Sequence, residues 1–160
     1  ALVPMIMNRL QLERLDDLVD FFLADQEEDG DDGDFDSGML APLVFEAAGQ
    51  GDAVSIGILE WAGQELGLSA RAVARNLFGG AESFPLVLGG SVLQKGATDH
   101  LTVALLADVR TEFPNASPVV LDLPPVAGAL LLARDRYTAL PGNSESLTPE
   151  EVLGALRGLI

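Results

Sequence analysis

Hydrophobic residues in the first part of the chain recur with the spacing of helical faces. Between Leu2 and Leu23 the apolar positions approximate one face of a helix, so a single helix is predicted over this range. The pattern breaks at residues 25–36, where carboxylates and glycines predict an acidic surface loop or insertion. Helical character returns from Met39 to Ala48. The N-terminal part is therefore predicted to be helical on both sides of an acidic loop.

A longer helical pattern follows from Ala53 to Gly67. Asp52 stands where an N-cap acceptor would satisfy the first free N–H groups, and Gly67 is expected to end the helix. Ser69 is then expected to cap a further helix that runs to Phe78. The apolar residues of the 53–67 segment surround much of its circumference, which predicts burial against more than one neighbour and places Trp61 in the core.

Two short apolar runs in the second half of the chain predict strands. Residues 84–88 are apolar on both faces, as in a strand that helices cover on both sides, and residues 119–123 form the second run. A helix that opens at Thr98 and ends at Phe113 is expected between them, so the two strands should be parallel. The pattern predicts a helix-rich α/β fold with one parallel β-α-β unit.

Two more helices are expected towards the C-terminus. One covers residues 126–134, directly after a proline pair that ends the preceding strand. The other covers residues 150–159, after a capping box in which Thr148 and Glu151 can satisfy each other's backbone N–H groups.

Composition limits the organisation of the protein. With 160 residues and 48% hydrophobic residues, residues 1–160 are expected to form a single domain with an acidic insertion at 25–36. The most hydrophobic segment, residues 126–133, is shorter than the ~20 residues that a membrane span needs. The chain has no Cys, which excludes disulfides and thiolate chemistry within it and fits a cytoplasmic location.

The net charge of −16 narrows the range of partners. Nucleic acid and anionic membranes both require a basic surface, so neither is expected to bind. A nucleotide would have to be held locally by backbone N–H groups, helix N-termini or a bridging cation, because the overall field opposes its approach.

The candidate binding site lies directly after the first strand. Gly89 and Gly90 stand at the carboxyl end of residues 84–88, the edge at which open α/β sheets bind ligands, and Ser91 follows them. Glycines at such an edge let the backbone approach a ligand closely. Gly89, Gly90 and Ser91 are therefore predicted to contact a cofactor, with a tight strand exit that binds nothing as the alternative. His100 and Lys95 are interpreted as surface residues.

Three segments between residues 40 and 135 carry a family resemblance: APLVFEAAGQGDAVSIGILEWAGQEL, PLVLGGSVLQ and VVLDLPPVAGALLLA. In this order they resemble the adenosine-binding motif and the second connecting motif of the actin/hexokinase/Hsp70 superfamily. Within it they are similar to the N-acetylglucosamine kinase-like proteins of the BadF/BadG/BcrA/BcrD ATPase family. The chain looks like the C-terminal part of such a protein.

The resemblance implies a ribonuclease H-like ATPase domain that uses ATP and Mg²⁺ to phosphorylate an amino sugar. Residues matching Gly89 and Gly90 would approach the phosphate and ribose end of the nucleotide, with Ser91 next on that loop, and Gly128 would permit close helix packing. The phosphate motifs and the catalytic carboxylate would precede Ala1, so no catalytic residue is assigned and the chain alone is expected to be inactive. Strands missing from the sheet would leave an edge or face that favours a homodimer or other self-association.

Two other functions stay open. An ATPase activator of a 2-hydroxyacyl-CoA dehydratase belongs to the same superfamily, but that branch uses cysteines, which this chain lacks. A non-catalytic acidic binding module is suggested by residues 25–36, which place carboxylates at positions 1, 3, 5 and 12 of an EF-hand-like loop, with glycine at position 6. Asp36 is short for the bidentate twelfth position, and Asp32 replaces the apolar anchor at the eighth. These departures favour a solvated insertion over a calcium site.

Overall fold

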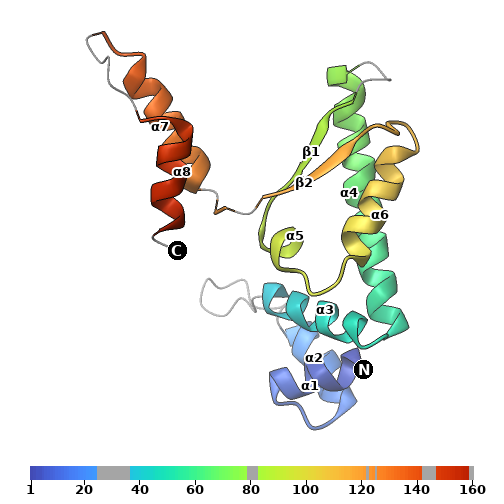
Figure 1. The fold of residues 1–160 in the computed structure, drawn as a ribbon. Helices are drawn as coiled ribbons and strands as arrows, with labels where there is room; N and C mark the ends of the chain where they lie inside the picture. Colours follow the sequence, from blue (N-terminus) through green and yellow to red (C-terminus); the bar gives the residue numbers. More distant parts are fainter. Residues whose placement is uncertain (25–36, 79–82, 122, 125, 142–146, 159–160) are drawn as a thin grey trace. The chain divides into compact units, whose positions relative to one another are not determined.

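The computed structural model describes residues 1–24, 37–78, 83–121, 123–124, 126–141 and 147–158, and Figure 1 shows the path of the chain. The elements are, in order, α1 (Leu2–Leu10), α2 (Leu15–Ala24), the 3₁₀ helix η1 (Ser37–Leu40), α3 (Ala41–Gly49), α4 (Ala53–Phe78), β1 (Pro85–Leu88), α5 (Ser91–Lys95), α6 (His100–Arg110), β2 (Ser117–Val120), α7 (Val126–Thr138) and α8 (Pro149–Arg157). The chain is helix-rich with a small parallel sheet, which confirms the α/β class.

The chain divides into two compact units, Ala1–Val120 and Leu121–Ile160. The prediction of a single domain over residues 1–160 stays a prediction. The acidic insertion at 25–36 lies outside the described residues. In the part of the chain that the structure describes, no helix combines the length and the apolar sequence that a membrane span requires.

The single helix expected over residues 2–23 is wrong, because two helices, α1 and α2, occupy this range. Gln11 ends α1 in the left-handed region, with φ 57° and ψ 36°. Leu12 N–H then donates to the Met7 carbonyl at 2.9 Å, which satisfies a carbonyl in the last turn of the helix. Glycine usually occupies such a terminating position, and a glutamine there gives the sequence no visible stop signal.

Helix α3 confirms the expected helical segment around residues 39–48, with η1 forming its entrance. The start of α4 is also as expected. Asp52 Oδ1 accepts hydrogen bonds from the N–H and the hydroxyl of Ser55, both at 3.0 Å, so this carboxylate caps the helix.

Helix α4 does not end at Gly67 but continues without a break to Phe78. The prediction of a second helix capped by Ser69 is therefore wrong. The Ser69 hydroxyl donates to the Glu65 carbonyl at 3.0 Å, a contact that serine makes within a helix rather than at its start.

Two of the three glycines of α4 allow it to pack closely against α6. Gly63 and Gly67 are both buried on the α6 side of the helix. A Cβ atom at Gly63 would lie 2.3 Å from the Leu101 carbonyl oxygen, and one at Gly67 would lie 2.7 Å from the Asp108 Cβ. Glycine at these two positions therefore lets the two helices approach more closely than any side chain would allow, which explains why a helix-stopping residue type lies inside α4.

Ion pairs connect the same two regions further along α4. Arg71 Nε donates to Asp108 Oδ2 at 2.7 Å, and Arg75 Nη2 donates to Glu112 Oε2 at 2.6 Å. The hydrogen bond from Arg75 lowers the pKa of Glu112 below its ordinary value. Bidentate arginine pairs of this kind have a defined geometry, so they help to fix the relative orientation of the two segments.

The two strands are parallel, with α6 between them in the sequence, which confirms the β-α-β unit. In the register, Val87 lies beside Val119 and Leu88 beside Val120. The second strand begins at Ser117 and ends at Val120, earlier than the expected 119–123. Likewise α6 begins at His100 rather than at Thr98.

The main hydrophobic core lies between the sheet and helices α4 and α6. Phe84 stacks on Phe78 with ring centroids 4.5 Å apart and meets Phe113 edge-on at 5.5 Å. The buried members of this cluster are Ala74, Phe84, Leu88, Leu105, Val109, Phe113 and Ala116. A second cluster joins α3, α4 and α6 and contains Phe45, Ala48, Leu59 and Leu101.

Within the unit Ala1–Val120, helices α4 and α6 cover one face of the sheet. Figure 1 shows α4 and α6 on the same side of β1 and β2. Phe84 and Leu88 point to that side and are buried, whereas Val87 and Val119 are 55% and 42% exposed. The expectation that helices cover the first strand on both sides stays a prediction for the second face, on which this unit places apolar side chains.

In the second unit, the start of α7 at Val126 confirms the predicted helix, which continues beyond residue 134 to Thr138. The capping box of α8 is also confirmed. Thr148 Oγ1 accepts from Glu151 N–H at 3.2 Å, and Glu151 Oε2 accepts from Thr148 N–H at 2.7 Å, which lowers the pKa of Glu151. The packing role of Gly128 stays a prediction, since a Cβ there would meet no described atom of this unit within 4 Å.

Candidate functional site

Gly89, Gly90 and Ser91 form the connection between β1 and α5, as the sequence predicts for a strand exit. Gly90 has φ 103° and ψ 152°, a conformation that residues with a side chain rarely adopt. All three residues are exposed, and a Cβ on Gly90 would meet nothing within 4 Å. Backbone conformation therefore requires glycine at position 90, while the space above it is open to a ligand.

A depression of about 590 Å³ adjoins this loop. Four elements contribute: α4, the loop after β1, α5 and α6. The lining residues are Trp61, Ala62, Glu65, Leu66, Gly89, Gly90, Ser91, Val92, Leu93 and Leu101. The volume lies within the range of about 300–1,000 Å³ typical of small-molecule sites. Of the residues that the structure describes around it, only Glu65 carries a charge, so the depression suits an apolar or neutral group.

Trp61 is the residue of this site that the sequence interpretation misplaced. It was expected in the core, but its side chain is 63% exposed. The buried face of α4 is defined by Ser55, Leu59, Gly63 and Gly67, which recur every fourth residue. Trp61 lies two residues from both Leu59 and Gly63 and therefore points away from that face. The regular four-residue spacing of this set was the signal that could have placed Trp61 correctly.

A second depression, of about 270 Å³, also adjoins the N-terminus of α5. It is lined by Gly38, Ala41, Pro42, Phe45, Ser91, Val92, Gly96 and Ala97. Ser91 and Val92 line both depressions. A ligand in either depression can therefore lie close to Ser91.

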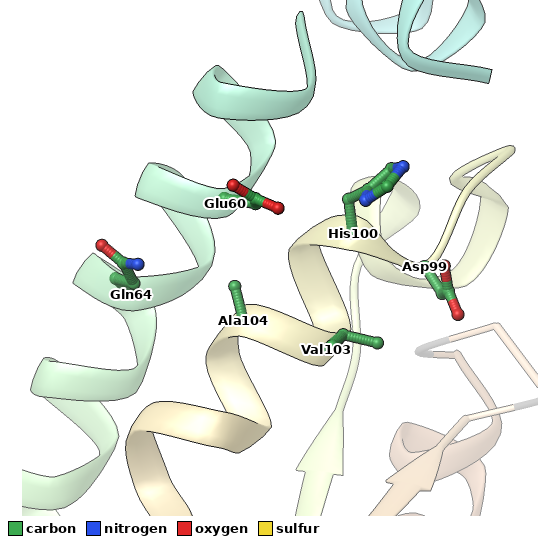
Figure 2. A pocket seen from close by; sticks show the side chains of 6 residues that line it. All are labelled: Glu60, Gln64, Asp99, His100, Val103 and Ala104. Atoms are coloured by element: carbon green, nitrogen blue, oxygen red, sulfur yellow. The ribbon is translucent and has the colours of Figure 1, made fainter. Parts of the chain in front are cut away.

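A third depression, of about 530 Å³, is lined by Glu60 and Gln64 of α4 and by the N-terminal half of α6 (Figure 2). Glu60 extends from α4 towards His100 on α6, while Asp99 points away from Glu60. His100 is the first residue of α6, which confirms its expected place at a helix end. Among the described residues, no group of three or more His, Cys, Asp or Glu side chains is placed to hold a metal ion. This depression therefore offers polar contacts but no metal centre.

The described geometry does not assemble a catalytic group at the candidate site. The depression beside Gly89–Ser91 can hold a planar, largely apolar ligand, and the loop can bring main-chain atoms close to it. Lys95 ends α5, close in sequence to the loop. No family model, no curated protein and no solved structure matches the chain. The family resemblance therefore stays a prediction, and the capacity of the site follows from its own geometry.

Proposed function

We propose that the chain is the nucleotide-binding C-terminal part of an ATP-dependent sugar kinase-like protein, which holds the adenosine part of ATP at Gly89, Gly90 and Ser91. The carrying observation is the loop itself: a positive-φ glycine at the carboxyl end of a parallel strand, opening onto a depression of small-molecule size. The ordered resemblance of three sequence segments to the N-acetylglucosamine kinase-like ATPases supports the same assignment.

The chain contributes nucleoside binding rather than chemistry. Glu65 at the depression and the net charge of −16 oppose phosphate, so the loop holds the base and ribose more readily than the phosphates. The described residues do not form a Mg²⁺ site of their own, and Mg²⁺ would be held by the phosphates together with groups outside them. The amino sugar and the catalytic carboxylate belong to the N-terminal part of a ribonuclease H-like, cytoplasmic enzyme.

Replacing Gly90 with valine is expected to weaken ATP and adenosine binding by at least about tenfold, because the side chain strains the loop and occupies the space above it. Gly51→Val is the matched control. Gly51 also has a positive φ, 83°, and open space around it, but it lies outside the depression. Calorimetric titration of both variants and the parent with each ligand measures the effect. Equal affinities for the parent and Gly90→Val would contradict the assignment of the loop.

The sheet face opposite α4 and α6 leads to an expectation about assembly. Val87 and Val119 are register partners, so their exposed side chains lie on the same face of the sheet. Exposed apolar sheet surfaces and unpaired edges favour association, and the chain is expected to form dimers or larger species as its concentration rises. Sedimentation velocity should show this, and the double change Val87→Lys with Val119→Lys should reduce it.

Val103→Lys provides the control for added charge, since Val103 is 56% exposed on α6, away from the sheet. It should leave association unchanged. A parent chain that sediments as a monomer at every concentration would show that the exposed face is not an interface between copies.

A further inference from the structure

Helix α4 carries an unusually exposed aromatic residue, Trp61, next to the candidate site. Trp61 is the single tryptophan of the chain, and its indole is 63% exposed. An exposed tryptophan contributes little to folding, because most of its apolar surface stays in water. It can contribute much more to binding, because indole offers a large, rigid π-surface at a low entropic cost.

The residues around Trp61 indicate which kind of ligand can contact its indole. The indole lines the same depression as Gly89 and Gly90, which have no side chains, so a flat ring can lie against the indole and still approach the main chain of the loop. Leu66 and Val92 add apolar walls to the depression. Bases are planar, and every base has a π-face that can stack on an aromatic side chain.

We propose that Trp61 is the platform on which the purine base of the bound nucleoside stacks, and that it sets the preference of the site for purines over pyrimidines. This inference rests on the proposed nucleotide function and names the recognition residue that the sequence interpretation had assigned to the core. A purine presents two fused rings to the indole, and a pyrimidine presents one. The adenosine moiety is therefore held mainly by stacking on Trp61 and by close approach to the glycine loop.

The competing role for Trp61 is contact with another protein. Val54 and Ile58 are also exposed, and with Trp61 they are spaced by four and three residues along α4, as on a helix face that docks a partner. The depression favours the nucleoside, because Trp61 shares it with the loop residues and not with Val54 or Ile58.

The test uses the intrinsic fluorescence of the intact chain, in which Trp61 is the one indole emitter. Adenosine is the probe, because it lacks the phosphates that the acidic chain repels, and N-acetyltryptophanamide corrects for absorption of light by the ligand. Saturable quenching by adenosine is expected, with the same dissociation constant that calorimetry gives. Cytidine should quench less and bind more weakly. Trp61→Ala should weaken adenosine binding by about tenfold or more, whereas Trp61→Phe, which keeps a ring, should lose less.

The outcomes separate this inference from the function on which it rests. If adenosine binds by calorimetry but leaves the emission unchanged, or binds Trp61→Ala as tightly as the parent, Trp61 is not the platform and the nucleotide function stands. If neither adenosine nor ATP produces heat or quenching, both proposals fail. If Trp61→Ala changes sedimentation and leaves adenosine affinity unaltered, Trp61 belongs to a protein interface and the stacking proposal is overturned. Circular dichroism of the two variants checks that the helices are retained.

Discussion

Replacing Gly63 with alanine is expected to lower the free energy of unfolding by about 1–3 kcal/mol, although alanine is the better helix former. The added Cβ would lie 2.3 Å from the Leu101 carbonyl oxygen and 2.9 Å from the Ala104 Cβ. Neither neighbour can move without separating α4 from α6, because one is backbone and the other is a methyl group fixed to it. Denaturation in guanidinium chloride, followed by circular dichroism, measures the change.

Gly57→Ala is the matched control on the same helix. Gly57 is exposed, and a Cβ there would meet no described atom within 4 Å. The same substitution should therefore raise the free energy of unfolding by about 0.5–1 kcal/mol, through the ordinary helix preference of alanine over glycine. Opposite signs at positions 57 and 63 are the signature of a glycine-mediated helix contact. A stabilising Gly63→Ala would show that α4 and α6 are not in close contact.

The second large effect is expected from Phe113→Ala, which should cost about 3–5 kcal/mol of unfolding free energy. Phe113 is fully buried in the cluster between the sheet and the two long helices, where its ring meets the edge of Phe84. Its removal leaves a cavity that the surrounding strands and helices cannot close without moving. Chemical denaturation of the parent and the variant under the same conditions gives the difference.

Trp61→Ala is the informative comparison, since it removes a larger aromatic ring. Because the Trp61 side chain is 63% exposed, its loss should change the unfolding free energy by no more than about 0.5 kcal/mol. A large loss at Trp61 together with a small loss at Phe113 would reverse the assignment of core and surface. It would also restore the original expectation that Trp61 is a core residue.

The sequence predicted those parts of the fold that local signals determine. The Asp52 cap and the Thr148 capping box depend on residues close to one another in the chain. The parallel pairing of the two strands followed from the helix between them, because a strand–helix–strand connection favours parallel strands. The wrong predictions concern helix ends, which a distant contact or an uncommon terminating residue determines. Gly67 has the local character of a helix stop, yet α6 packs against it and the helix continues. Gln11 ends α1 at a position where glycine is usual, so the sequence carries no signal for this helix end.

The candidate site was likewise predicted only in part from the sequence. The strand exit at Gly89–Ser91 was visible because a glycine pair directly follows an apolar run, and the structure places a positive φ at Gly90. The contribution of α4 to the depression could not be predicted from the sequence, because these residues lie more than twenty positions before the loop. Apolar periodicity alone favoured burial of Trp61. Because α4 packs through another face, the bulky side chain of Trp61 stays exposed.

The central claim, that the loop after β1 and the adjoining depression bind a nucleoside, is tested most directly by nuclear magnetic resonance of the ¹⁵N-labelled chain during titration with adenosine. Binding should shift the amide signals of Gly89, Gly90 and Ser91 and the indole N–H of Trp61 in a saturable way, and should leave Gly51 unchanged. ATP with Mg²⁺ should shift the same signals. Saturable shifts confined to other residues, or none at millimolar adenosine, would contradict the account.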